Sequence, residues 1–220
     1  MGDRRDLQLS VFSFYIKRSV RVNVSFYFFA VAAVIALFDK SGLLLMGLLS
    51  ALLHEAGHLT AMLLLPGHAP TEISLTPFGL KIRSSPLAEF ADGNPAVLAA
   101  GSGVNLALAA VFYFLVPRCA VMARFASLNL VMGTVNLLPV ETLDGGGLLR
   151  LLLRCILSDR ACDFVMTAVS LVTLTVMAFA GFIVLLRTRY NFTLLGMSLC
   201  LLFSLLLRLT RDAPHCALTK

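Results

Sequence analysis

The stretch LLSALLHEAGHLTAMLLL, residues 48–65, places two histidines and a glutamate within a run of leucine, alanine and methionine. Without these three residues, the run would be an ordinary candidate for a membrane-spanning helix. A charged side chain at the centre of such a helix costs about 2.5–3.5 kcal/mol on insertion scales. We therefore expect His54, Glu55 and His58 to serve a function that outweighs this cost.

The whole chain has the composition of an integral membrane protein. Of its 220 residues, 59% are hydrophobic and 14% are charged, and the mean hydropathy is +0.89. Several apolar windows are each long enough to cross a hydrocarbon layer of about 30 Å as a helix. These windows are 22–38, 41–65, 95–116, 119–138, 161–186 and 191–207. The sequence predicts an all-α membrane protein, a bundle of about six transmembrane helices.

The basic residues predict how this single membrane domain is oriented. Its expected parts are a basic amino-terminal tail at 1–21, a membrane core at 22–207 and a short carboxy-terminal tail at 208–220. Of the 18 lysines and arginines, 13 lie in the two tails and in the connections 66–94 and 139–160. The positive-inside rule then places both termini in the cytoplasm. Anionic lipid accounts for the net charge of +6, and no nucleic-acid partner is expected.

Two connections depart from the apolar pattern. In the first, Glu72–Leu75 alternates between polar and apolar residues and is followed by Pro-Phe-Gly at 77–79. This pattern predicts a small β-hairpin at the cytoplasmic surface, and the segment Glu72–Ile82 could offer an exposed edge that pairs with an extended substrate. The second, LLPVETLDGGGLLR at 137–150, contains a proline and three glycines that do not suit the middle of a helix. Such backbone is tolerated at membrane depth only beside protein or a watery cavity.

The spacing of His54 and His58 is that of a metal site. Residues four apart on a helix lie on one face one turn apart, and Glu55 lies about 100° around from His54. In this H-E-x-x-H pattern two imidazoles share one Zn²⁺, and the carboxylate reaches the attacking water as general base. The alternative is a pair of buried histidines hydrogen-bonded to neighbouring helices. That alternative must account for the insertion cost of three polar residues within five positions.

A zinc site needs a third protein ligand and an open position. The candidate is Asp144, which follows the fourth apolar window at the amino end of a predicted short helix, 145–157. There the helix dipole favours a carboxylate. The alternative for Asp144 is an ordinary helix N-cap.

The combination of HEAGH at 54–58 with NLLPVETLDGG at 136–146 resembles the site-2 protease family of intramembrane zinc metalloproteases. The stretches EISLTPFG at 72–79 and AAGSGVN at 99–105 are also similar to that family. The Pro-Phe-Gly version is closest to its stage IV sporulation FB protease branch. The resemblance implies one Zn²⁺ per chain, held by His54, His58 and Asp144, with Glu55 as the catalytic base.

The resemblance also implies residues that contact the substrate. Asn136 matches an asparagine that lies beside the site and helps hold the substrate backbone, and Asn105 matches the asparagine of the third span. Three stretches depart from the family pattern. Residues 101–105 are Gly-Ser-Gly-Val-Asn where the family usually has G-P-x-x-N. Residues 140–142 are Val-Glu-Thr where the family is often proline-rich, and Gly147 stands where an arginine is common.

The implied function is hydrolysis of peptide bonds in or near the transmembrane segment of a membrane-associated substrate, such as a sporulation transcription-factor precursor. The implied setting is a bacterial cell membrane, with a regulatory membrane protein as a further partner. The residues alone leave two other classes open. Intramembrane His, Glu and Asp also occur in ion or proton transporters and channels, and a non-catalytic zinc-binding membrane protein would share the ligands.

Overall fold

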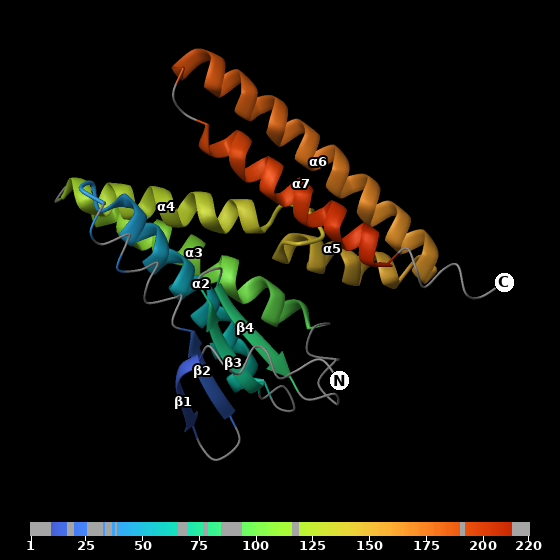
Figure 1. Cartoon of the computed structure of the whole chain (residues 1–220), viewed down its shortest axis with the longest axis horizontal. Helices are drawn as coiled ribbons and strands as arrows, with labels where there is room; N and C mark the ends of the chain where they lie inside the picture. Colours follow the sequence, from blue (N-terminus) through green and yellow to red (C-terminus); the bar gives the residue numbers. More distant parts are fainter. Residues whose placement is uncertain are drawn as a thin grey trace. The chain divides into compact units, whose positions relative to one another are not determined.

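The computed structural model describes residues 10–16, 20–25, 33, 37, 39–65, 70–76, 79–84, 94–115, 119–189 and 192–212 (Figure 1). The chain divides into two compact units, Met1–Val135 and Asn136–Lys220. The histidines of the HEAGH motif belong to the first unit, and Asp144 belongs to the second.

The first unit contains a sheet of four strands in the order β1-β2-β3-β4 (Figure 1). The strands are β1 Ser10–Ile16, β2 Val20–Ser25, β3 Pro70–Thr76 and β4 Gly79–Ser84. β1 pairs with β2 and β3 pairs with β4 in antiparallel fashion, whereas β2 and β3 are parallel. β3 therefore has a neighbour on each side, and the outer strands of the described sheet are β1 and β4.

The sheet corrects the expected start of the first membrane span. Val22–Ser25, assigned from hydropathy to the helical window 22–38, lie in β2. The sequence VRVNVS alternates apolar and polar residues with the period of a strand, a signal that hydropathy averaged over a long window does not register. Ala33 and Leu37 are helical, and most other residues of this window lie outside the described ranges.

The described part of the first unit also contains α2 Leu43–Leu64, α3 Pro95–Leu115 and α4 Ala120–Asn136, whose last residue opens the second unit. α2 packs along α3. At this contact a Cβ on Gly57 would lie 2.9 Å from the Ala100 carbonyl oxygen, so a glycine permits the close approach. α4 meets α3 through Phe125 and Phe112, whose rings form an edge-to-face pair with centroids 5.0 Å apart.

The carboxylate of Asp39 organises the start of α2. Its Oδ2 accepts a hydrogen bond from the Leu45 N–H at 2.9 Å, and its Oδ1 accepts one from the Ser41 hydroxyl at 2.8 Å. Gly42, at the helix N-cap, has a left-handed φ of 72°, which glycine adopts without strain. The hydrogen bond from the Leu45 backbone is the main reason that the pKa of Asp39 lies below its usual value.

The second unit consists of α5 Asp144–Arg154, α6 Asp159–Thr188 and α7 Thr193–Asp212. α6 and α7 pack along each other (Figure 1), and Gly181 allows α6 to approach the backbone of Leu195. The loop before α5 contributes Val140 to a buried cluster with Leu174 of α6 and Leu205 of α7. This cluster ties the start of the unit to its two long helices.

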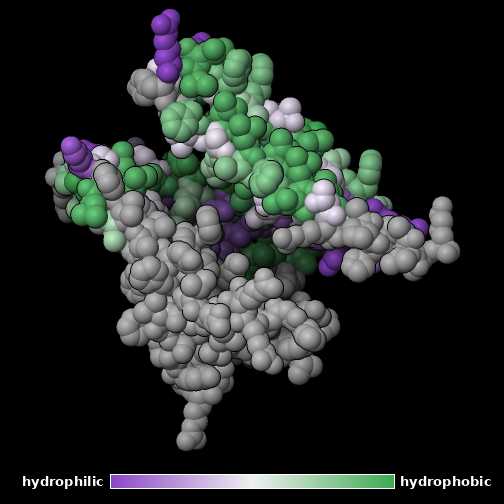
Figure 2. All heavy atoms as spheres, in the orientation of Figure 1, coloured by the Kyte–Doolittle hydropathy of each residue, from purple (hydrophilic) through white to green (hydrophobic). Residues whose placement is uncertain are grey.

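Three helices of the described part, α2, α3 and α6, are long and apolar enough to cross a membrane. The apolar part of α7, Thr193–Leu207, is shorter, and α4 has 17 residues. Hydrophobic side chains cover the α6–α7 pair (Figure 2), with Phe179 and Phe203 each more than 60% exposed. Such surface suits lipid rather than water. The expected count of six spans and the orientation of the termini stay predictions.

Candidate metal centre

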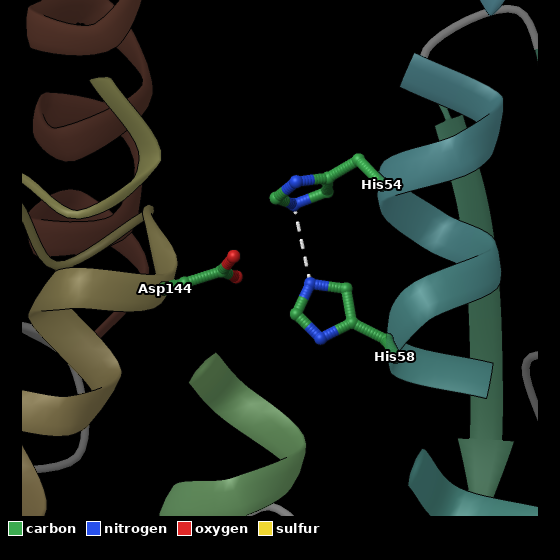
Figure 3. A group of neighbouring side chains, drawn as sticks. All are labelled: His54, His58 and Asp144. Carbon is green, nitrogen blue, oxygen red and sulfur yellow. Dashed lines mark hydrogen bonds between the residues drawn. The ribbon is translucent and has the colours of Figure 1, made fainter. Parts of the chain in front are cut away.

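His54 and His58 lie on successive turns of α2 with their rings facing each other (Figure 3). The two Nε2 atoms form a hydrogen bond at 3.2 Å, and the rings meet nearly at right angles. His54 is buried, whereas His58 is half-buried. The helical spacing of four residues therefore does direct one nitrogen of each imidazole to the same point.

A backbone carbonyl of α3 fixes the orientation of His58. The Nδ1–H of His58 donates a hydrogen bond to the Val97 carbonyl oxygen at 2.8 Å. This bond leaves the Nε2 lone pair of the neutral ring available as a ligand, the arrangement that metal-binding histidines commonly use. The same ring lies directly over Gly101, where an added Cβ would be 2.3 Å from Nε2. Gly101 thus makes room for the imidazole.

Glu55 follows His54 on α2 and is half-buried. A carboxylate on the turn that carries both imidazoles has the reach of a general base toward a water held between the histidines. Glu55 is not needed as a ligand in this arrangement, because two histidines and one further residue supply the three protein ligands. Its carboxylate can then take up and release a proton.

Asp144 is the first residue of α5 in the second unit and is half-buried (Figure 3). The N-cap of α5 is Leu143, so Asp144 does not occupy the capping position that was the alternative for it. A carboxylate in the first turn is favoured by the helix dipole. α5 begins at Asp144, one residue before the predicted start, and ends at Arg154, three residues before the predicted end.

The glycines after Asp144 are required by the path of the chain. A Cβ on Gly145 would lie 2.1 Å from the Leu137 carbonyl oxygen, and one on Gly146 would lie 2.0 Å from that of Val140. Both distances are far below any real contact, so only glycine fits. The glycine run, which was expected to interrupt a helix, lies in the first turn of α5, where the backbone of the preceding loop packs against it.

The two asparagines predicted to bind substrate have different surroundings. Asn105 of α3 is fully buried, and neither polar atom of its amide has a hydrogen-bond partner among the described residues. Leaving a buried amide unsatisfied costs about 1–3 kcal/mol, so Asn105 has the capacity to bind an extended peptide group. Asn136 is half-buried at the carboxyl end of α4. Asn129 donates to the Phe125 carbonyl within α4, as expected for a residue of the helix interior.

The histidine pair fits a zinc ion. Two nitrogens bound to one tetrahedral zinc at about 2.0–2.1 Å would lie about 3.3 Å apart. The observed separation of the two Nε2 atoms is 3.2 Å. A set of two imidazoles and one carboxylate suits zinc among the common biological metals. His58 also has the outer hydrogen bond that such a ligand needs.

Comparisons with known proteins agree with this chemistry. Peptidase family M50 matches residues 118–180, a range that includes Asn136 and Asp144 but not the HEAGH motif. The fold resembles the solved structure of the site-2 protease from Methanocaldococcus jannaschii, with a TM-score of 0.53 and 19% identity, over 88% of this chain and 93% of that one. Comparison with curated proteins gave no match. The family match supports a metallopeptidase, and the solved structure supports a fold of the site-2 protease type. With the three apolar helices, they point to an integral membrane protein.

Proposed function

We propose that this chain is an intramembrane zinc metallopeptidase that holds one Zn²⁺ with His54, His58 and Asp144. It cleaves peptide bonds in or near the transmembrane segment of a membrane-associated protein. The observation that carries the proposal is the pair of Nε2 atoms, 3.2 Å apart on a helix apolar enough to cross a membrane. The family match adds support for Asp144, which lies within the matched range.

The residues of α2 have distinct tasks in the proposed reaction. When bound, zinc supplies a Lewis acid and lowers the pKa of a coordinated water toward about 7. Glu55 takes a proton from the attacking water and later delivers it to the leaving amine. His58 is held by the Val97 carbonyl, so its Nε2 keeps one direction throughout the cycle. The surrounding apolar helix limits access of bulk water and strengthens these electrostatic interactions.

The substrate must become extended before it is cut, because a peptide bond in a helix is hidden by its own hydrogen bonds. The amide of Asn105 supplies both a donor and an acceptor that have no other use in the described part of the chain. Asn136 is proposed to hold the substrate backbone as well. Side-chain amides suit this task because they match the peptide group without selecting particular side chains.

The sheet of the first unit is proposed to receive the extended substrate as an added strand. The segment expected to offer the edge was Glu72–Ile82, but its first part lies in β3, between β2 and β4. The exposed edge near α2 is therefore assigned to β4, which packs against α2. Single cysteines in β4 should cross-link to a substrate cysteine, whereas cysteines in β1, the opposite edge, should not. Cross-linking from β1 alone would contradict the assignment.

The substrate class is proposed to be a regulatory proprotein anchored in the membrane, such as a sporulation transcription-factor precursor. The support is the similarity of the Pro-Phe-Gly version of the segment at 72–79 to the sporulation branch of the site-2 proteases. Co-expression of the chain with such a proprotein and with an unrelated single-span protein tests this class. Equal cleavage of both would show that the proprotein is not preferred.

The proposed function is tested by comparing the parent with Glu55→Gln in the same co-expression assay. The substitution removes the base but keeps the size of the side chain, so cleavage should fall at least ~100-fold. The control is the zinc content of the purified variant, which should equal that of the parent. Cleavage at the parental rate by Glu55→Gln would rule out the proposed mechanism.

A further inference from the structure

An ion-pair network lies beside the loop that leads into α5. Arg150 of α5 contacts the carboxylate of Glu141 at 3.1 Å and also pairs with Asp163 of α6. The Glu141 side chain is only 7% exposed, and that of Arg150 is 22% exposed. A carboxylate this deeply buried depends on its partner, because without Arg150 the charge of Glu141 would lie buried and uncompensated.

The backbone of the same loop is also attached to α6. The Glu141 N–H donates a hydrogen bond to the Ser170 hydroxyl at 2.9 Å, and Ser170 is completely buried. The preceding residue, Val140, is completely buried in the cluster with Leu174. Residues 140 and 141 are thus held by an ion pair, a hydrogen bond and apolar packing.

The connection from Glu141 to Asp144 is short and closely packed. The Leu143 N–H donates to the Val140 carbonyl oxygen at 2.8 Å, and the Gly147 N–H donates to that of Leu143 at 3.1 Å. Gly146 lies against the Val140 carbonyl, with no room for a Cβ. A change in the position of residue 141 would therefore be transmitted to the first turn of α5, where Asp144 lies.

We propose that Arg150 is a positioning residue, which fixes the direction of the Asp144 carboxylate by holding Glu141 against α5 and α6. The proposal rests on the proposed function, because it takes Asp144 to be the third zinc ligand. Arg150 is not one of the proposed ligands, and its contacts with Glu141 and Asp163 are ion pairs. It acts from less than two turns along the helix that Asp144 begins.

Zinc affinity of the purified full-length protein, measured by competition with a chelator, tests this role. Mutating a residue that supports a metal ligand from the outer shell typically lowers metal affinity about 10–100-fold. We expect a loss of zinc affinity in that range for Arg150→Met. The matched control is Arg154→Met, because Arg154 is exposed in the last turn of α5 and pairs with no carboxylate in the described part of the chain. Arg154→Met should bind zinc like the parent.

Two further readouts separate positioning from a general loss of stability. The absorption spectrum of the Co²⁺-loaded protein should differ between Arg150→Met and the parent, because the ligand geometry changes. In a Glu141→Gln background, Arg150→Met should have a smaller effect on zinc affinity than it has alone. If Arg150→Met fails to fold, Glu141→Gln and Arg150→Lys provide the same comparison.

Parental zinc affinity and a parental Co²⁺ spectrum in Arg150→Met would overturn the positioning role. Retention of zinc by Asp144→Ala would instead overturn the proposed ligand set. The two failures are therefore distinguished by which variant keeps the metal.

Discussion

At the residue scale, Gly101 decides where the imidazole of His58 can lie. The ring rests against the α3 backbone, between the Val97 carbonyl that accepts its Nδ1–H and the Cα of Gly101. Any larger residue at position 101 would occupy the space of a proposed ligand. The glycine therefore belongs to the site, although it has no side chain that could bind a metal.

Gly101→Ala should reduce zinc affinity at least ~10-fold, because the new Cβ would lie 2.3 Å from His58 Nε2 and force the ring to move. Gly103→Ala is the matched control on the same helix, since no atom lies within 4 Å of the Cβ it would add. Chelator competition on both purified variants provides the measurement. Equal affinities in the two variants would show that His58 does not depend on this contact.

At the element scale, α2 is both the helix of the proposed site and a candidate membrane span. Its start is organised by Asp39, whose lowered pKa means that folding stabilises the charged carboxylate. For such a group the contribution to stability is complete above its unfolded pKa of about 3.9. It is lost as the pH falls through the lower pKa of the folded state.

The stability difference between the parent and Asp39→Asn should therefore depend on pH. At pH about 6 the parent should be the more stable, and the two melting curves should converge as the pH falls below the unfolded pKa and through the lower pKa of the folded state. Thermal unfolding of both proteins in the same detergent, measured across this range, provides the test. A difference that stays constant with pH would mean that the charge of Asp39 has no part in holding the start of α2.

A contact could be predicted from the sequence only where the two residues lie close together along the chain. His54 and His58 are one helical turn apart, so periodicity alone indicates that their rings share a face. The contact of His58 with Val97 could not be predicted, because the two residues are 39 positions apart and meet only through the packing of α2 against α3. The ion pair of Arg150 with Asp163 depends in the same way on the packing of α5 against α6.

At the scale of the whole molecule, hydropathy indicated the membrane class but not every element. α2, α3 and α6 match apolar windows of the sequence and are candidate spans. The parallel pairing of β2 with β3 joins segments about 50 residues apart, and no local pattern indicates which strands will meet. The prediction used the alternation of the hairpin segment, whereas the alternation of VRVNVS in β2 was masked by hydropathy averaged over a long window.

The orientation in the membrane is predicted from the distribution of basic residues. Reporter fusions after Lys40 and Arg189 should be external, and fusions after Ser85 or Lys220 should be cytoplasmic. Alkaline phosphatase and green fluorescent protein fusions report the two sides independently. External signals from Ser85 and Lys220 would reverse the predicted orientation.

Zinc content is the most direct test of the central claim, that a histidine pair on α2 and Asp144 hold a catalytic metal. Metal analysis of the purified parent should give about one Zn²⁺ per chain, as expected for a single site with three protein ligands. His54→Ala, His58→Ala and Asp144→Ala should each lose most of the zinc, whereas Glu55→Gln should keep it. A parent without zinc, or an unchanged zinc content in the histidine variants, would contradict the account.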